Sequence, residues 1–283
     1  MTAPATAVVP TLGRSALLDD CLASIAACEP PPAEMLVVDQ SGSEEVRRVV
    51  ERFSEAGARC LHSSPRGKAR ASNLALEEAR HEIVLFTDDD CTVEPSWVAA
   101  CIDALERDPP ALVTGRVLAP DGAGHVPSTI DDLEPRTYAG TPRVDALYWG
   151  NMAARRSALA ALGGFDARLA LAAADNDLCW RWLRAGGRIR FEPGMVVLHH
   201  DWRGPDELDA VYARYARGQG ALYGKHLRRG DLYIARYLVR DVAYVGRALS
   251  AALRKGGLRP DPWARGIATE LPRGLAEGWR AER

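Results

Sequence analysis

The chain has 283 residues, of which 47% are hydrophobic and 26% are charged. This composition is typical of an ordinary soluble globular protein, and it excludes a disordered chain, a collagen-like fibre and a small disulfide scaffold. The formal net charge of -2 excludes a protein that binds nucleic acid through an overall basic surface.

The charges are unevenly distributed along the chain. Residues 178–283 contain 20 Lys and Arg against 11 Asp and Glu, whereas residues 1–177 contain 16 against 27. An acidic first part followed by a basic tail indicates metal or phosphate chemistry in the first part. It also indicates an anionic surface as a partner of the tail.

The six cysteines form no C-x-x-C pair. Their positions inside apolar stretches favour unpaired structural thiols in a reducing compartment over a disulfide framework. The N-terminus has no basic segment followed by an apolar one, so no signal peptide is expected. No apolar run reaches the ~18 residues needed to cross a bilayer, and the sequence therefore predicts a cytoplasmic protein.

Short apolar runs alternate with stretches of helical periodicity through the first 107 residues. The predicted strands are Thr6–Val9, Met35–Asp39, Cys60–His62 and Glu82–Thr87. The predicted helices are Ser15–Ala27, a helix after the capping residue Ser43, Lys68–Arg80 and Trp97–Arg107. Four strand–helix units in a row predict a parallel, doubly wound sheet with right-handed crossovers.

The pattern is less regular in the second part of the chain. Strands are predicted at Ala111–Leu118, Val144–Trp149, Arg188–Phe191 and Met195–His199. Helices are predicted at Arg156–Leu162 and Asp175–Arg184, and Ala119–Thr141 is expected to be a loop that acts as a flap. From Pro205 the chain is expected to be helical, with breaks near Gly230, Gly256-Gly257 and Pro260–Pro262.

Polar residues stand where the predicted parallel strands end. Pro10-Thr11 follows the first strand, Asp39 ends the second, and Asp88-Asp89-Asp90 follows the fourth. Ligands of open α/β sheets bind beyond these carboxyl ends. Because no glycine-rich phosphate loop is present, a divalent cation held by carboxylates is expected to neutralise the phosphates. The alternative for the aspartate triplet is a solvated turn.

An ordered set of motifs is similar to that of family 2 glycosyltransferases with the GT-A fold. It extends over roughly residues 6–200. The set consists of Val9-Pro10-Thr11, Val37-Val38-Asp39, Gly67-Lys68-x-x-x-x-Asn73, Phe86-Thr87-Asp88-Asp89-Asp90, Gly150-Asn151-Met152-Ala153, Gly163-Gly164-Phe165-Asp166 and Asp175-Asn176-Asp177-Leu178.

The resemblance implies an α/β fold with a Rossmann-like, mostly parallel central sheet and helices on both faces. Residues 1–204 would form the GT-A domain, in which residues 1–110 are the nucleotide-binding half and residues 111–204 the acceptor-binding half. Residues 205–283 would form a helical C-terminal extension outside the shared core.

The resemblance also implies which residues contact the nucleotide sugar. They are Pro10, Thr11, Asp39, Gly67, Lys68, Arg70, Asn73, Asp88 and Asp89. Asp39 would accept a hydrogen bond from the base, and Asp88 would hold the ribose or base. Lys68 and Arg70 would add positive charge, although a solvated helix start would carry the same residues.

Asp90 is implied to bind the Mn²⁺ or Mg²⁺ ion that bridges the diphosphate. His199 or His200 would add one further ligand, because neutral imidazole suits Mn²⁺. His199 fits better, since it lies two residues after Val197 in the predicted strand. A purely structural histidine is the alternative.

Asp175 is implied to be the general base that takes the proton from the acceptor hydroxyl. Attack from the face opposite the diphosphate would invert the anomeric configuration. A helix N-terminus stabilises an ionised carboxylate, although Asp175 could also be only an N-cap. The acceptor would be contacted by Trp149, Gly150, Asn151, Gly164, Asp177 and Arg181.

The chain departs from the family pattern at several positions. Ser72 stands where Arg is frequent, Gln40 follows Asp39 where an acidic residue or Asn is common, and Ala174 precedes the base where Glu is frequent. The Q-x-x-R-W signature of processive synthases is absent, so transfer of a single sugar is expected.

The tail contains a stretch, Asp231–Leu253, in which Arg236, Arg240 and Arg247 fall within about 40° on a helical wheel and apolar residues occupy much of the rest. Such a helix can lie on an anionic membrane surface. It can equally pack on the protein core or on a second subunit as part of a homodimer.

The sequence therefore predicts a metal-dependent inverting glycosyltransferase that uses a nucleoside diphosphate sugar. The acceptor hydroxyl would belong to a glycan, a glycolipid or a small metabolite. A sugar-phosphate nucleotidyltransferase is less favoured, because the loop Pro10–Arg14 is poor in glycine. A non-catalytic nucleotide-binding or scaffold protein of the same fold is the other alternative.

Overall fold

The structure is a computed structural model that describes residues 1–64, 66–107, 112–122, 126–169, 172–200, 205–257 and 259–281. The chain divides into two compact units. The sheet unit comprises Met1–Asp166 and Asp175–Trp202, and the helical unit comprises Ala167–Ala174 and Arg203–Arg283. The predicted domain boundary at residues 204 and 205 falls next to residues 201–204, which lie outside the described residues, and it stays a prediction.

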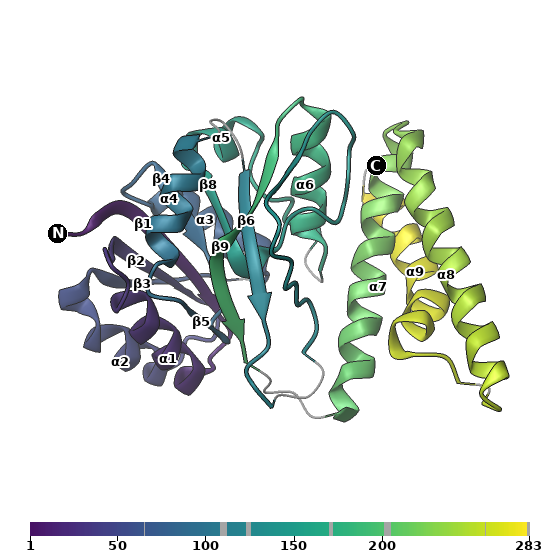
Figure 1. The fold of residues 1–283 in the computed structure, drawn as a ribbon, viewed down its shortest axis with the longest axis horizontal. Helices are drawn as coiled ribbons and strands as arrows, with labels where there is room; N and C mark the ends of the chain where they lie inside the picture. The colour runs from purple at the N-terminus through teal and green to yellow at the C-terminus, as the bar shows by residue number, and fades with distance from the viewer. Residues whose placement is uncertain are drawn as a thin grey trace. The chain divides into compact units, whose positions relative to one another are not determined.

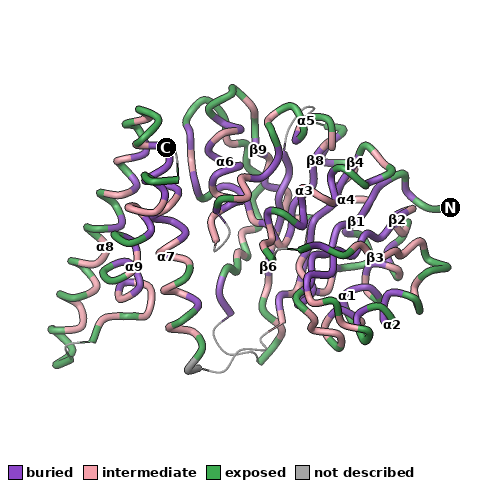
Figure 2. Tube along the Cα trace, turned by 180° about the vertical axis from the view of Figure 1, so that it is seen from behind, coloured by how far each residue is buried: buried purple, intermediate pink, exposed green. Residues whose placement is uncertain are grey.

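The first half of the sheet unit forms the parallel sheet that the sequence predicts. Four strands lie in the order β3-β2-β1-β4 and run in one direction. They are β1 (Ala3–Thr11), β2 (Pro32–Asp39), β3 (Ala58–His62) and β4 (Ile83–Phe86). Nearly all residues of β1, β2 and β4 are buried (Figure 2). Burial on both faces explains why these strands are apolar without alternation.

Four helices pack on these strands (Figure 1). They are α1 (Ser15–Ala26), α2 (Glu44–Arg52), α3 (Lys68–Glu78) and α4 (Trp97–Arg107). The helices α1, α2 and α4 contribute Leu18, Val46 and Trp97 to one apolar core that they share with β1 and β2. Ser43 caps α2 as predicted, because its hydroxyl accepts a hydrogen bond of 3.2 Å from the backbone N–H of Glu45.

The second half of the sheet is mixed. The short strand β8 (Met152–Arg155) runs antiparallel between β4 and β6 (Leu112–Leu118). The long strand β9 (Ile189–His199) runs parallel to β6, and β5 (Cys91–Val93) and β7 (Arg136–Tyr138) pair with it in the antiparallel sense. The strands β1, β2, β3, β4, β6 and β9 therefore run in one direction, and the predicted mostly parallel α/β sheet is confirmed.

Three predictions in this half were wrong. The run Val144–Trp149 is not a strand, because its apolar residues Val144, Ala146 and Leu147 are buried in a loop. The two strands predicted around residues 188–199 are a single strand, β9, with a register shift opposite Gly115 and Arg116. The expected loop Ala119–Thr141 contains β7, and its residues 123–125 lie outside the described residues.

Two short helices belong to the second half of the sheet unit. They are α5 (Arg156–Ala161) and α6 (Ala174–Arg184), and the 3-10 turn η2 (Trp149–Asn151) leads into β8. Both helices were predicted to within two residues of these bounds.

The helical unit contains α7 (Pro205–Arg228), the 3-10 turn η3 (Leu232–Ile234), α8 (Ala235–Arg254) and α9 (Pro262–Ala281). The helices α7 and α9 meet at glycines. A Cβ atom at Gly274 or Gly278 of α9 would overlap the carbonyl oxygen of Arg217 or Ala221 of α7. In the described part of the chain, no helix combines the length and the apolar character needed to cross a membrane.

Candidate active site

The carboxyl ends of the parallel strands meet at one edge of the sheet. In the register of the sheet, Thr11 at the end of β1 pairs with Asp39 at the end of β2. The aspartate triplet follows β4, the other neighbour of β1, and Cys91 directly after it pairs with His199 at the end of β9. The fold therefore brings the predicted donor and metal residues to the edge at which open α/β sheets bind ligands.

The three aspartates have different environments. Asp89 is fully buried and accepts a 2.6 Å hydrogen bond from the Thr11 hydroxyl. Asp90 is 3% exposed, whereas Asp88 is half-buried and forms an ion pair with Lys68. Burial raises the pKa of Asp89, against hydrogen bonds from Arg14 and Thr11 that lower it. Because two of the three carboxylates are buried, the triplet is not a solvated turn.

Arg14, which the sequence analysis did not assign to the site, holds two of these carboxylates. Its guanidinium contacts Asp89 through Nε at 3.2 Å and Asp90 through Nη1 at 3.0 Å. Burial disfavours the charged form of Arg14 and by itself would lower its pKa. The interactions with Asp89 and Asp90 have the larger effect, and the pKa of the guanidinium is raised. The sequence did contain a signal for Arg14. Buried carboxylates need a cation as a partner, and Arg14 is the first basic residue after β1.

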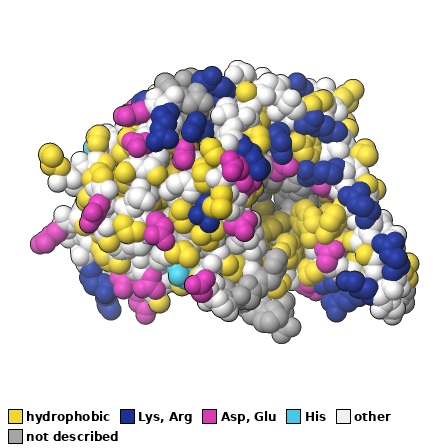
Figure 3. Space-filling model, in the orientation of Figure 1, with side chains coloured by type: hydrophobic (Ala, Val, Ile, Leu, Met, Phe, Trp, Pro, Cys, Tyr) yellow, Lys and Arg dark blue, Asp and Glu magenta, His cyan; other side chains and the backbone are white. Residues whose placement is uncertain are grey.

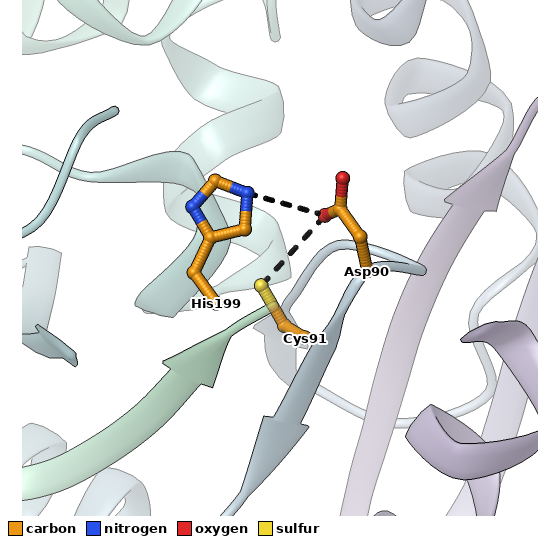
Figure 4. Close-up of side chains that lie close together, drawn as sticks. All are labelled: Asp90, Cys91 and His199. Carbon is orange, nitrogen blue, oxygen red and sulfur yellow. Dashed lines mark hydrogen bonds and ion pairs between the residues drawn. The ribbon is translucent and has the colours of Figure 1, made fainter. Parts of the chain in front are cut away.

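Asp90, Cys91 and His199 form a cluster of metal-ligating groups (Figure 4). Asp90 Oδ1 lies 3.6 Å from His199 Nε2 and 3.9 Å from Cys91 Sγ. Burial, together with the charges of Asp88 and Asp90, raises the pKa of the Cys91 thiol well above its ordinary value. The cluster offers a carboxylate, a thiol and an imidazole to a cation.

His200 occupies a different environment from His199. Its Nε2 lies 2.9 Å from the hydroxyl of Thr92, and its backbone N–H donates to the carbonyl of Asp90. Of the two candidate ligands, only His199 faces the Asp90 carboxylate in the described structure.

Lys68, at the start of α3, lies between the aspartate triplet and the candidate base. Its ammonium pairs with Asp88 and lies 4.8 Å from the centre of the Trp149 ring. Burial disfavours the charged form, but Asp88, Asp175 and Asp90 outweigh this effect and raise the pKa of Lys68. The predicted positive charge at the site therefore lies close to carboxylates, on a side chain of which 38% is exposed.

Asp175 lies in the first turn of α6. Its Oδ1 accepts a 3.0 Å hydrogen bond from the backbone N–H of Asn176. Burial raises the pKa of Asp175, although Lys68 and backbone N–H groups that include that of Trp149 act in the opposite direction. Ala173, two residues earlier, has a φ of 69°, an uncommon conformation for a residue with a side chain, and such strain is frequent at functional sites.

The other predicted donor residues surround the same strand ends. Asp39 closes a turn, because its carboxylate accepts from Ser41 N (2.8 Å), Ser41 Oγ (2.6 Å) and Gly42 N (3.0 Å). Pro10 is buried in β1, Gly67 precedes α3 and donates its N–H to the Gln40 side chain, and Arg70 is exposed.

Asn73 and Gly164 belong to a contact between α3 and the loop after α5. The Asn73 side chain both accepts from and donates to the backbone of Phe165, each at 2.8 Å. A Cβ atom at Gly164 would lie 2.6 Å from Asn73 Oδ1. The Phe165 ring stacks on Trp149 with centroids 4.4 Å apart, and this contact fixes the ring that faces Lys68.

Three residues predicted to contact the acceptor have side chains directed into the protein instead. Asn151 is fully buried, and its amide bonds to Trp97 Nε1 (2.9 Å) and to the carbonyls of Arg116 and Met195. Asp177 is also fully buried and pairs with Arg181 at 2.7 Å. Arg181 in turn donates to the carbonyls of Leu162 and Gly164. The hydrogen bonds and the ion pair of these side chains stabilise the part of the protein beneath the site.

Trp149 and Gly150 lie beside the charged groups. The Gly150 Cα hydrogen points toward Asp88, because a Cβ atom there would lie 3.3 Å from Asp88 Oδ2. The Gly150 carbonyl accepts a 2.9 Å hydrogen bond from Thr87. The backbone at residue 150 thus approaches the triplet closely, and a side chain at this position would crowd Asp88.

Comparison with known proteins identifies the family. The sequence model of the family described as Glycosyl transferase family 2 matches residues 6–162, which is more than half of the chain. A pre-mycofactocin glycosyltransferase from Mycobacterium tuberculosis (strain CDC 1551 / Oshkosh) is 30% identical over 163 residues, which are 53% of this chain and 34% of that protein. A glucosyl-dolichyl phosphate glucuronosyltransferase from Haloferax volcanii is 26% identical over 145 residues, which are 48% of this chain and 46% of that protein. The chain therefore spans less than half the length of these curated relatives.

Solved structures show the fold. The mannosyltransferase PcManGT from Pyrobaculum calidifontis, in complex with GDP-Man and Mn²⁺, matches with a TM-score of 0.64 at 20% identity, over 100% of this chain and 87% of that chain. Residues 1–349 of S. aureus TarS, in complex with UDP-GlcNAc, match with a TM-score of 0.66 at 15% identity, over 100% of this chain and 89% of that chain. The predicted family, enzyme class and fold are confirmed: the chain belongs to glycosyl transferase family 2 and has the GT-A fold.

Proposed function

We propose that this chain transfers one sugar from a nucleoside diphosphate sugar to an acceptor hydroxyl, with a bound divalent cation and with inversion at the anomeric carbon. The observation that carries the proposal is the charge arrangement around Lys68, whose ammonium pairs with Asp88 and interacts with Asp175 and Asp90. This arrangement joins the proposed donor, metal and base residues in one electrostatic network at the carboxyl edge of the sheet.

The donor nucleotide would bind at the ends of β1, β2 and β4. The two carboxylate oxygens of Asp39 offer about four acceptor positions, and the turn at Ser41 and Gly42 uses three of them. One position of Oδ2 is thereby left for an N–H of the base. Asp88 would contact the ribose or base, and Lys68 would place its positive charge near the phosphates.

The residues fit a hard divalent cation such as Mn²⁺ or Mg²⁺. A carboxylate oxygen of Asp90 and an imidazole nitrogen of His199 face each other on buried side chains, and both are suitable ligands. Asp90 and His199 would hold the ion, and Arg14 orients Asp90 by contacting its other oxygen. When bound, the ion supplies positive charge that stabilises the departing diphosphate.

Asp175 would act as the general base. Its carboxylate would accept the proton of the acceptor hydroxyl as that oxygen attacks the anomeric carbon from the face opposite the diphosphate. Partial burial raises the pKa of Asp175, which strengthens it as a base at neutral pH. The hydrogen bonds from the backbone of Asn176 and Trp149 keep the carboxylate oriented.

The comparisons support a nucleoside diphosphate sugar as the donor class. Two of the solved structures that match contain GDP-Man and UDP-GlcNAc, and one of these also contains Mn²⁺. The two donors carry different bases, so the class of donor is proposed and the base is left to experiment. The family match ends at residue 162, and the assignment of Asp175 therefore depends on the geometry described above.

The first experiment is a thermal-shift panel of UDP, GDP, dTDP and CDP, each with and without Mn²⁺. A ligand at ~100 times its Kd adds about 2.7 kcal/mol to the free energy of unfolding, which raises Tm by several degrees. We expect one diphosphate to stabilise the protein in a metal-dependent manner. The sugar nucleotides of that base are then tested for transfer, with the anomeric configuration of the product determined by NMR.

Variants separate donor binding from catalysis. Asp90→Asn is expected to remove the metal-dependent part of the shift. Asp175→Asn is expected to keep the shift while turnover falls by ~10²–10⁴-fold, the range for loss of a general base. Asp103→Asn, at an exposed position of α4, is the matched control and should change neither. Normal turnover of Asp175→Asn would contradict the base assignment, and no shift with any nucleotide would favour a non-catalytic scaffold.

A further inference from the structure

One face of α8 is both apolar and exposed. Val239, Val242, Leu249 and Leu253 have exposed fractions of 67%, 59%, 42% and 52%. At 100° per residue these four side chains fall within a sector of about 80° on one side of the helix. Soluble proteins rarely leave a contiguous row of large apolar side chains in water without a partner.

A row of arginines borders this apolar sector. Arg236, Arg240, Arg247 and Arg254 fall within about 40° of one another on the same helical wheel. Figure 3 shows Lys and Arg side chains gathered over α8 at the right of the view. The exposed surface of α8 therefore consists of an apolar strip with a basic strip beside it.

The acidic residue of α8 is on the opposite face. Asp241 is 4% exposed and accepts a 2.7 Å hydrogen bond from the hydroxyl of Tyr223 on α7. Tyr237 is also buried on this face, and the Arg236 guanidinium stacks on Tyr233 and Tyr237 at 4.0 and 4.7 Å. These contacts fix the rotation of α8 about its axis, so that the apolar and basic strips face outward together.

We propose that α8 is an interfacial helix that binds the surface of a bilayer containing anionic lipids. Its apolar strip would enter the boundary between headgroups and acyl chains, and its arginines would bind lipid phosphates and carboxylates. The helix would lie on the membrane rather than cross it, because only one of its faces is apolar.

The charge of the helix argues against a second copy as the occupant. A symmetric contact between two copies brings the same surface patch together from both sides. Here that patch carries four arginines, and the acid of α8, Asp241, is buried and pairs with one of them, Arg240, at 3.2 Å. An anionic bilayer supplies the negative charge that a second α8 lacks.

The test is co-sedimentation of the full chain with vesicles, in the absence of any sugar nucleotide, so that it is independent of the proposed reaction. Vesicles of phosphatidylcholine with 30 mol% phosphatidylserine are compared with vesicles of phosphatidylcholine alone. We expect binding to the anionic vesicles only. It should weaken at high salt, since ~1 M salt reduces the Debye length to about 3 Å.

Paired variants test each strip of the helix. Arg247→Glu/Arg254→Glu removes two arginines and should weaken vesicle binding by roughly 25-fold or more, at about fivefold for each lost cation. Leu249→Ser/Leu253→Ser should also weaken binding. Arg47→Glu/Arg48→Glu on α2 makes the same change of charge on an exposed helix of the sheet unit and should leave binding unchanged.

Three results would overturn the proposal. The first is equal binding to neutral and anionic vesicles, and the second is equal weakening by the control pair on α2. The third is a concentration-dependent dimer in sedimentation velocity that Leu249→Ser/Leu253→Ser dissolves, since that would make a second copy the occupant. Circular dichroism and Tm of each variant show that loss of vesicle binding does not come from unfolding.

Discussion

The three adjacent aspartates of the triplet have different roles although they carry the same charge. Asp89 is held inside by Thr11 and Arg14, Asp90 is shared between Arg14 and His199, and Asp88 faces Lys68. Asp89 therefore contributes to the site by fixing the loop, while its neighbours have oxygens available for chemistry. The direction of each aspartate side chain, as much as its residue type, therefore decides whether its oxygens are available to a ligand.

The raised pKa of Asp175 predicts the pH dependence of transfer. The base must be ionised to accept a proton, so kcat/KM should rise with pH through the pKa of Asp175 in the free enzyme. Because burial raises that pKa above the ordinary value of ~3.9 for Asp, the acidic limb should lie at higher pH than an exposed Asp would give.

A pH–rate profile between pH 4 and 8 checks this prediction. Asp175→Asn should lose the acidic limb together with most of its activity, whereas Asp103→Asn should keep both. A limb that survives unchanged in the residual activity of Asp175→Asn would assign the titration to another group.

The residues at strand ends could be predicted from the sequence, and those beneath them could not. Asp39, Asp90 and Asp175 follow a strand or begin a helix, and such positions lie at an edge of the sheet. Asn151 and Arg181 occur in equally polar motifs, but their side chains turn inward and satisfy backbone carbonyls. Residue type and spacing do not distinguish a polar group that binds a ligand from one that binds the backbone.

At the scale of elements, the sequence analysis predicts those helices and strands whose residue pattern is contained in a short stretch of the chain. The helices α1 to α4 follow from periodicity within about ten residues, and the strands β1 to β4 follow from short apolar runs. The strand β8 has four residues and pairs with β4, about seventy residues earlier in the chain. Its sequence, Met152–Arg155, carries no alternation of its own, and only its neighbours in the sheet make it a strand.

A buried carboxylate joins three elements at the opposite end of the sheet from the site. Glu34 of β2 is 1% exposed and accepts hydrogen bonds from Thr6 Oγ1 of β1 (2.6 Å), Arg59 Nε of β3 (2.6 Å) and the backbone N–H of Arg80 (2.9 Å). Burial opposes ionisation, but the hydrogen bonds outweigh it, and the pKa of Glu34 is lowered.

This network predicts an acid-sensitive contribution to stability. A carboxyl with a lowered pKa in the folded state stabilises the protein above its unfolded pKa of ~4.3 for Glu, and the contribution is lost as the pH falls through the folded value. Glu34→Gln should therefore lower the free energy of unfolding at pH 7 by roughly 1–3 kcal/mol. The difference from the unmodified protein should shrink toward pH 3.

Denaturant unfolding at pH 3, 5 and 7 measures this difference. Glu44→Gln, at an exposed ion pair of α2, is the control and should change stability little at any pH. A Glu34→Gln deficit that stays constant from pH 7 to pH 3 would mean that packing rather than charge explains the loss.

At the scale of the whole molecule, the reactivity of the six cysteines measures how readily the protein unfolds. All six are unpaired, and five of them are buried, as the sequence analysis predicted for structural thiols. Burial raises the pKa of Cys28 to about 11 and that of Cys179 to about 12. A thiol must be both accessible and ionised to react, so these groups should react only when the chain opens.

We expect a thiol reagent at pH 8 to modify Cys60, the one half-buried thiol, well before the others. The remaining five should react together at the rate of global or local unfolding. Labelling followed by mass spectrometry, with and without denaturant, measures both phases. Rapid modification of Cys21 or Cys91 without denaturant would show that the region around the aspartate triplet opens more readily than its burial indicates.

The glycine contacts between α7 and α9 determine how this pair of helices can evolve. Gly220 and Gly224 of α7 face the carbonyls of Leu271 and Leu275, and Gly274 and Gly278 of α9 face those of Arg217 and Ala221. The spacing of the helices is thus set by peptide groups, which are the same in every sequence, and no rotamer can absorb an added methyl group. Any side chain at one of these four positions would therefore force the two helix axes apart.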